Sequence, residues 1–387
     1  YPTVPVSEPR IAVKQAVIQG LRVPQLAWVV EAWWSAADVR PEGWRYWVDA
    51  GDGDLLAEES LVCSFDVGGT LCSWATPGTL PDTDANPEVL FEVPYAKVTA
   101  DGGLETYTNR NGSWVFPGIT TATNVTFRYA GLHALTDDAT GAEYVRVEPS
   151  LRGIGNTIEM NASGDPFTTA EANAYLVINK VGDYIRDVQC DESGACDVTI
   201  PDVLTTAIVN EAGCAPSASG STAHFQVSPP GICVNTAYST IIAHEYGHVL
   251  NSRYETAHGG NTGVNEGTAD IWSMYVFDWP HTGEDWNANT EYVRTGGPKN
   301  MEQFCGDSWQ GLCSTFNHHQ EGLHWMGAAW KVRDALDIRH GDALGDMIAD
   351  TIFVSWMNAY SHPQKIASAF QIEWLLLFYA AAKIGVA

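Results

Sequence analysis

The spacing of hydrophobic positions predicts strands in the first part of the chain. Between residues 61 and about 150, apolar residues alternate with polar ones, as Val125, Phe127 and Tyr129 do, so each strand has one buried and one solvated face. Turn residues such as Asp, Asn and Gly separate these strands. We therefore expect a β-sandwich over residues 61–150.

The first 60 residues form a separate β-rich segment. They are rich in Trp and Val, and their alternating apolar positions run into a turn of Gly and Asp residues after Val48. This pattern predicts strands joined by a hairpin.

Helical periodicity replaces this alternation after residue 151. Apolar residues three and four apart predict helices that each turn one face toward a core. We therefore expect residues 151–387 to be α+β with a mainly helical C-terminal lobe, which makes the whole chain a multidomain α+β protein. The first predicted helix has an apolar stripe of Ala174, Ile178, Val181 and Ile185 behind a cap at Thr168 or Thr169. A second has a stripe from Trp325 to Leu336 and ends near Gly341. A third starts at Pro363.

Composition narrows the class of protein. With 387 residues, of which 45% are hydrophobic and 17% charged, the chain can bury a core in two or three domains. Its net charge of −27, without a basic stripe, argues against a nucleic-acid partner. The longest apolar run, Trp374–Ala382, is too short to span a membrane. An acidic surface of this kind is compatible with solubility or with calcium binding.

Eight cysteines fall into four close pairs. An even count with local pairing indicates disulfides. The alternative, a cysteine-ligated zinc, is disfavoured because the chain contains no C-x-x-C pair. Because disulfides persist in oxidising compartments, we expect a secreted protein. The predicted pairs are Cys63/Cys72, Cys190/Cys196, Cys214/Cys233 and Cys305/Cys313.

The strongest chemical signal is the sequence His244-Glu245-Tyr246-Gly247-His248. Residues four apart share one face of a helix, so both imidazoles can bind one metal ion. Glu245 is then placed to take a proton from a metal-bound water. A glycine inside a helix indicates close packing or function at Gly247. The alternative is a pair of surface histidines beside an ordinary glutamate.

A second motif follows, with two carboxylates four residues apart at Glu266 and Asp270. One of them can bind the metal while the other hydrogen-bonds the free nitrogen of a histidine ligand. Two histidines and one carboxylate leave the fourth tetrahedral position for water, as a catalytic zinc site requires. The alternative is a solvated acidic helix face.

These motifs resemble those of the gluzincin metallopeptidases, the group that includes thermolysin and the fungalysins. Segments 171–187, 233–251 and 322–336 are similar to bacterial fungalysin-like secreted peptidases, and together they span most of residues 165–340. The resemblance implies a thermolysin-like zincin catalytic domain over residues 151–387. Residues 1–60 resemble the tail of the propeptide in this group, and the equal alternative is that they are extra strands of the β domain. The resemblance also implies one catalytic zinc held by His244, His248 and Glu266, with Asp270 hydrogen-bonded to a histidine ligand.

Differences from related groups narrow the resemblance. Seventeen residues separate His248 from Glu266, fewer than in the thermolysin pattern, so the connecting loop is short. The third-histidine pattern of the metzincins is excluded because Asn251 and Tyr254 stand where Gly and His would be. No G-x-M-E-N-like segment precedes the motif, which favours an endopeptidase over a zinc aminopeptidase.

A hydrolase that forms a tetrahedral oxyanion needs a hydrogen-bond donor beside the metal. His324 follows Gly322 and Leu323 at the predicted start of a helix, as in thermolysin-like enzymes. Fungalysin-like sequences place a histidine earlier, where His319 stands. We prefer His324 and keep His319 as the alternative, with Tyr254 as a third candidate. Both histidines could instead be exposed loop residues.

The sequence therefore predicts a secreted zinc endopeptidase. Glu245 takes the proton of a zinc-bound water and passes it to the leaving amine. Its expected partners are protein or peptide substrates, without nucleic acid or membrane. Two alternatives stay open: a zinc aminopeptidase, and a surface- or matrix-binding protein in which the β region binds and the zinc domain is a scaffold.

Overall fold

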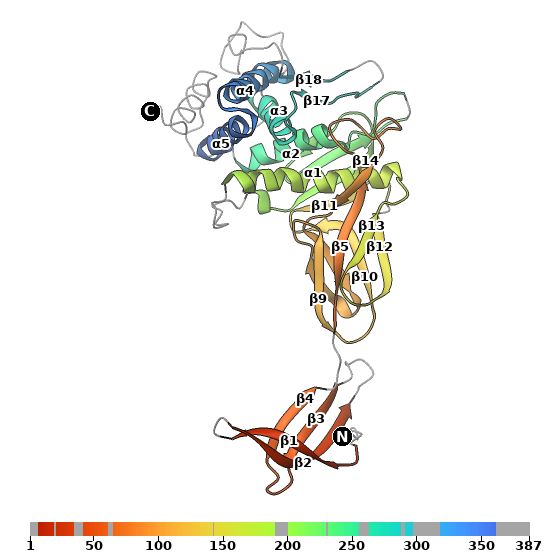
Figure 1. The fold of residues 1–387 in the computed structure, drawn as a ribbon. Coiled ribbons are helices and arrows are strands. Elements are labelled where there is room, and N and C mark those ends of the chain that lie inside the picture. The colour runs from red at the N-terminus through yellow and green to blue at the C-terminus, as the bar shows by residue number, and fades with distance from the viewer. Residues whose placement is uncertain are drawn as a thin grey trace. The chain divides into compact units, whose positions relative to one another are not determined.

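The computed structural model shows an α+β protein in which strands occupy the first 160 residues and all α-helices follow them (Figure 1). The described residues contain five α-helices and several separate sheets, which confirms the predicted α+β class. The structure describes residues 7–18, 21–34, 42–60, 65–141, 143–189, 200–229, 231–254, 263–287, 291–296 and 318–360.

The chain divides into two compact units. The first comprises residues 1–68 with segments 115–124 and 149–156, and the second comprises residues 69–114, 125–148 and 157–387. The three domains expected from the sequence, with boundaries near residues 60 and 150, stay a prediction.

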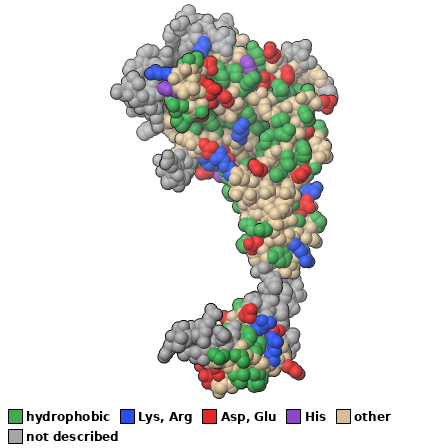
Figure 2. Space-filling view, viewed as in Figure 1, with side chains coloured by type: hydrophobic (Ala, Val, Ile, Leu, Met, Phe, Trp, Pro, Cys, Tyr) green, Lys and Arg blue, Asp and Glu red, His purple; other side chains and the backbone are tan. Residues whose placement is uncertain are grey.

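Four antiparallel strands form a sheet in the first unit. They are β1 (Arg10–Ile18), β2 (Leu21–Trp34), β3 (Glu42–Asp49) and β4 (Leu55–Ser60), paired in that order. The Asp49 carboxylate accepts the backbone N–H of Gly51 at 2.6 Å in the turn after β3, so the predicted hairpin is confirmed. Ala27 and Val29 are buried, whereas hydrophobic side chains on the other face of the sheet are exposed (Figure 2).

The chain between residues 65 and 160 is β-structured, as the alternation predicts. In β10 (Thr123–Gly131) the side chains of Val125, Phe127 and Tyr129 are buried, while Arg128 is exposed. The other strands are β5 (Phe65–Ala75), β6 (Val89–Glu92), β7 (Ala96–Ala100), β8 (Leu104–Tyr107), β9 (Ser113–Ile119), β11 (Ala134–Asp138), β12 (Val145–Leu151) and β13 (Asn156–Met160).

These strands belong to two sheets. One has the order β13-β5-β6, with β9 paired to β5. The other is extended by three later strands, β14 (Thr205–Ala212), β15 (Ser217–Ser219) and β16 (Thr222–Val227). Its order is β15-β16-β14-β11-β10-β7-β8, with β12 paired to β10. Within this sheet β15 is an edge strand.

Helix α1 (Pro166–Gln189) begins earlier than predicted. Asp165 is its cap, because the Asp165 carboxylate accepts the backbone N–H of Thr168 at 3.0 Å. Pro166 follows at the first helical position, where no N–H partner is needed. The cap predicted at Thr168 or Thr169 is therefore wrong. The predicted apolar stripe of this helix is confirmed, since all four of its residues are buried.

Helices α2 (Ser239–Arg253) and α3 (Gly263–Phe277) pack closely against each other. A Cβ built on Gly247 would lie 2.9 Å from the Cα of Ala269, so only glycine permits this approach. The predicted close packing at Gly247 is confirmed. Asn251 strengthens the contact, because its Nδ2 donates to a backbone oxygen of α3 at 3.0 Å. Both helices are buried along most of their lengths, so their polar side chains need partners within the protein.

Helices α4 (His318–His340) and α5 (Asp342–Tyr360) complete the described chain. Helix α4 starts at His318 and not at His324, and it ends where the sequence predicts. The helix predicted from Pro363, with its apolar run, lies outside the described residues. No α-helix in the described part of the chain is both long and apolar enough to span a bilayer.

One of the four predicted cysteine pairs is confirmed, because Cys214 and Cys233 form a disulfide. Cys72 is buried and is not bonded to another cysteine within the described residues, and its predicted partner Cys63 lies outside them. The pairs Cys190/Cys196 and Cys305/Cys313 also lie outside the described residues.

Candidate metal centre

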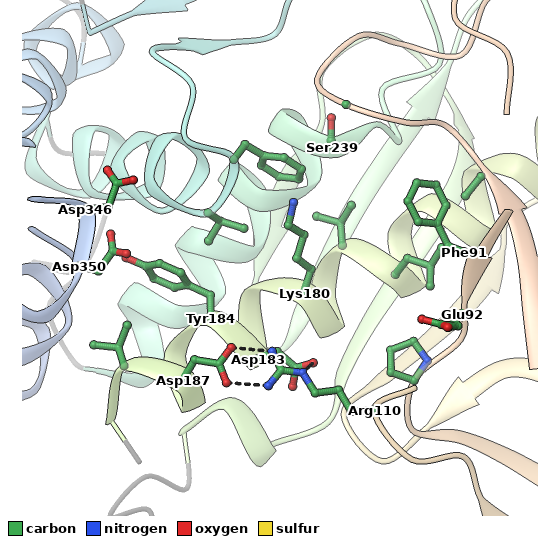
Figure 3. Close-up of a pocket in the computed structure, with 18 of the residues that line it drawn as sticks. Phe91, Glu92, Arg110, Lys180, Asp183, Tyr184, Asp187, Ser239, Asp346 and Asp350 are labelled. Carbon is green, nitrogen blue, oxygen red and sulfur yellow. Dashed lines mark hydrogen bonds and ion pairs between the residues drawn. The ribbon is translucent and has the colours of Figure 1, made fainter. Parts of the chain in front are cut away.

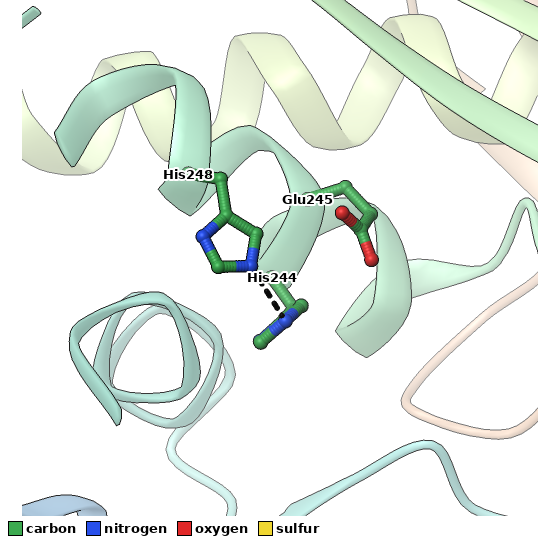
Figure 4. Close-up of side chains that lie close together, drawn as sticks. All are labelled: His244, Glu245 and His248. Atoms are coloured by element: carbon green, nitrogen blue, oxygen red, sulfur yellow. Dashed lines mark hydrogen bonds between the residues drawn. The ribbon is translucent and has the colours of Figure 1, made fainter. Parts of the chain in front are cut away.

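Neighbouring buried helices carry the two sequence motifs. His244, Glu245 and His248 lie on α2, and Figure 4 shows the two imidazoles side by side with the carboxylate next to them. Glu266 and Asp270 lie on α3. The close contact at Gly247, between the two histidines in sequence, brings α3 near enough for its carboxylates to reach them.

The ligand atoms are spaced as one tetrahedral metal ion requires. The Nε2 atoms of His244 and His248 are 3.1 Å apart. They lie 3.6 and 3.7 Å from the two carboxylate oxygens of Glu266, one near each. Zinc bonds of about 2.0–2.1 Å in tetrahedral geometry separate the ligand atoms by about 3.3–3.4 Å. These three side chains therefore fit a zinc ion.

Asp270 contacts one of these candidate ligands. Its Oδ1 lies 2.8 Å from Nδ1 of His244, and its side chain is fully buried. A hydrogen bond from Nδ1 to a carboxylate fixes the tautomer in which Nε2 can bind a metal. In this structure that Nε2 lies 3.0 Å from Nη1 of Arg294.

Arg294 is part of the site, although no sequence motif includes it. It lies on β18 (Arg294–Thr295), which pairs with β17 (His281–Thr282). Its Nη1 atom is 2.9 Å from Asp270 and 3.3 Å from Glu266, so one cation faces two buried carboxylates. Removing this cation would leave buried charge uncompensated. Arg294 reaches the site only through the pairing of two short strands, which no local pattern predicts.

The environment of Glu245 suits proton transfer. Its side chain is nearly buried, and burial raises the pKa of Glu245 to about 7, although His244 and Arg294 act in the opposite direction. A carboxylate with a pKa near 7 can both accept and release a proton at neutral pH. Burial and the neighbouring His244 lower the pKa of His248 to about 4, whereas the pKa of His244, although burial and Arg294 act in the opposite direction, is raised to about 9 by Asp270 and Glu266.

Of the two histidines considered as oxyanion donors, His319 and not the preferred His324 lies at the candidate site. His319 lies with its Nε2 3.5 Å from Glu266, and it lines the cavity together with His318. His324 is buried further along the helix and is not among the described residues that line the cavity. The helix start expected at His324 is therefore wrong, because α4 begins at His318, and the role of His324 as a donor stays a prediction. Tyr254 is fully buried and also absent from the described lining.

The candidate metal centre opens into a cavity of about 690 Å³. Edge strand β15 lines one wall, and the loop that leads into it begins at Cys214, which is tied to Cys233 by the disulfide. Glu245 and Glu266 are the only carboxylates among the described residues of the lining.

A larger cavity of about 930 Å³ lies among α1, α5 and nearby loops (Figure 3). Its charged residues are mostly paired with each other or with neighbours. Arg110 donates two hydrogen bonds to Asp187, and the shorter one joins Nη2 to Oδ2 at 2.5 Å. Arg333 donates a hydrogen bond to Asp350 at 2.6 Å. Among the described residues, both groups of three side chains that could hold a metal lie at the smaller cavity. The candidate metal site therefore lies at the smaller cavity.

A scan against known protein families finds no matching family for this chain. A search of curated proteins finds no match either. The gluzincin resemblance thus rests on the motifs themselves.

Proposed function

We propose that this chain is a zinc-dependent endopeptidase of the gluzincin type. One observation carries the proposal: His244, His248 and Glu266 present three ligand atoms at tetrahedral spacing, with Glu245 beside them in an open cavity. Three protein ligands leave one position free, which distinguishes a catalytic zinc site from a structural one. The finer architecture, a thermolysin-like catalytic domain over residues 151–387 behind a β-sandwich and a propeptide-like segment, belongs to the same proposal.

The chain's own residues divide the remaining work. A zinc ion, when bound, supplies a Lewis acid that polarises a carbonyl group and lowers the pKa of a water. Glu245 accepts the proton of the attacking water and returns it to the leaving amine. Asp270 and Arg294 keep His244 and Glu266 in place through the contacts described above.

His319 is the donor that we assign to the developing oxyanion. It lines the cavity beside Glu266, and its side chain is 47% exposed, so it can meet a substrate. A donor that strengthens its hydrogen bond as the carbonyl oxygen gains charge stabilises the transition state selectively. His324 stays the alternative donor, but it would have to reach the cavity from a buried position.

Two features of the cavity favour an endopeptidase over an aminopeptidase. Edge strand β15 offers backbone groups to which an extended peptide can add as a further strand. Besides the metal ligand Glu266 and the base Glu245, the described lining holds no carboxylate that could bind a free amino terminus. A substrate that continues in both directions from the scissile bond fits such a cavity.

The disulfide between Cys214 and Cys233 supports an extracellular location, since such bonds are rare in reducing compartments. Protein and peptide substrates outside the cell are the partners that we propose. A calcium ion, compatible with the acidic composition, stays a prediction.

The test is cleavage of an unfolded protein by the purified chain. We expect internal cleavage that a zinc chelator abolishes and added zinc restores. A cleavage map from mass spectrometry separates internal cuts from stepwise removal of N-terminal residues, which would indicate an aminopeptidase. Zinc binding without any cleavage would instead favour the scaffold alternative, in which the β region binds a surface or matrix.

A further inference from the structure

A second group of metal-binding side chains adjoins the first. Glu266, His318 and His319 each offer one ligand atom, and these atoms all lie within 4.8 Å of one another. The His319 Nε2 is 3.5 Å from Oε2 of Glu266, close to the spacing of ligands around one tetrahedral ion. The rings of His318 and His319 are 4.3 Å apart, so both imidazoles lie at the same end of α4. Neither His318 nor the pairing of these two histidines has a role in the proposed hydrolysis.

The crossing of α3 and α4 fixes this group in place. A Cβ built on Gly322 would lie 2.9 Å from the Cβ of Glu266, so α4 touches α3 at the residue that carries the shared carboxylate. His318 and His319 stand one turn before Gly322 on α4. Their imidazoles are therefore held beside Glu266 by helix packing, not by a loop.

We propose that Glu266, His318 and His319 bind a second divalent metal ion next to the first. Glu266 has two oxygens, one near His248 and the other near both His244 and His319, so its carboxylate can bridge two ions. Bridged pairs of ions in proteins lie about 3.5–4 Å apart. Two imidazoles and a carboxylate are ligands that suit zinc.

The second ion is bound more weakly than the first. Its three ligands include a carboxylate that the first ion also uses, and the first ion and Arg294 both repel it. It fills when free zinc is in excess. It then occupies the Nε2 of His319, the atom assigned to the oxyanion, so excess zinc inhibits hydrolysis. This last consequence rests on the proposed function, whereas the binding of the second ion does not.

The test is the amount of zinc bound by the whole chain at equilibrium as the free zinc concentration is raised. We expect a tight first ion and a weaker second ion in the unmodified protein. His318→Ala should weaken the second ion by about 10- to 100-fold and leave the first unchanged. The matched control is Gln320→Ala, which changes an exposed neighbour on the same cavity wall and should keep both ions.

Cobalt(II) in place of zinc gives a second readout, because its visible absorption reports the ligands of each ion as it binds. A protein that binds a single ion at all concentrations would overturn the proposal. So would a second ion that persists in both His318→Ala and His319→Ala, since it must then lie elsewhere. A protein that cleaves peptides but binds no second ion would contradict only this inference. A second ion that depends on His318, in a protein that cleaves nothing, would sink only the proposed function.

Discussion

Gly267 and Gly322 lie against each other where α3 crosses α4, so closely that a Cβ on Gly267 would come within 2.6 Å of the Gly322 carbonyl oxygen. Glu266 directly precedes the first of these glycines. The crossing therefore sets the distance between a proposed zinc ligand and His319, and any side chain at either glycine must push the two helices apart.

Gly322→Ala should lower the free energy of unfolding by about 1–3 kcal/mol through overpacking. Helix propensity alone would favour alanine by about 1 kcal/mol, so a loss of stability must come from the contact. We also expect weaker zinc binding, because Glu266 moves with α3. Urea unfolding and zinc content measure the two effects.

The matched control is Gly182→Ala in α1. A Cβ there meets the end of the Arg186 side chain, with Nη1 at 3.3 Å, and no backbone atom of the described residues outside α1 lies within 3.8 Å. The loss of stability in this variant should therefore be much smaller than that of Gly322→Ala. Equal stability of both variants would show that the α3–α4 crossing has room to spare.

Glu245→Gln should abolish peptide cleavage and keep the zinc. The amide has a similar shape but cannot accept the water's proton, and loss of a general base costs roughly 10²- to 10⁴-fold in rate. Metal content by mass spectrometry and kcat on a peptide substrate separate the two properties. If zinc is lost together with activity, Glu245 is a ligand or a structural residue and not the base.

The sequence predicts most of the site because its chemistry is local to helices. Residues four apart must share a helix face, so His244 and His248 could be placed together without knowledge of the fold. The start of α4 is predicted six residues too late, at His324 instead of His318, although Asn317 followed three residues later by Gln320 is a pattern typical of a helix start. Arg294 comes from a short strand whose partner is set by the tertiary fold. Long-range pairing of this kind leaves no periodic trace in the sequence.

Asp270→Asn should weaken zinc binding by about 10- to 100-fold. The neutral amide no longer holds Nδ1 of His244 as the carboxylate does, and it leaves the Arg294 cation with one carboxylate partner in place of two. Competition with a chelator measures the affinity. Unchanged affinity would mean that the contact between Asp270 and His244 contributes nothing to metal binding.

Glu171 should make stability depend on pH around neutrality. Burial raises the pKa of Glu171 to about 7, although hydrogen bonds from Tyr144 and Thr136 favour its ionised form. Because the folded pKa lies above the unfolded value, the stabilisation is complete below about pH 4.5 and is lost as the pH rises through 7.

The comparison is between the original protein and Glu171→Gln, each unfolded by urea at pH 5 and at pH 8. The difference in unfolding free energy between the two proteins should shift by about 1–3 kcal/mol in favour of the original protein at the lower pH. Other groups that titrate in this range cancel in that difference. A difference independent of pH would show that Glu171 titrates alike in the folded and unfolded chains.

The two candidate oxyanion donors can be compared by replacing each of them separately. His319 lines the cavity 3.5 Å from Glu266, whereas His324 is only 6% exposed and does not belong to the described lining. His319→Ala should therefore lower kcat by about 10²-fold or more, with the first zinc ion retained, because the lost hydrogen bond forms fully only in the transition state. His324→Ala should mainly reduce stability, since it leaves a cavity in a packed helix. Measuring kcat, KM and the free energy of unfolding for both variants separates these effects. If His324→Ala lost catalysis at unchanged stability while His319→Ala kept it, the donor would be His324, as the resemblance to thermolysin-like enzymes implies.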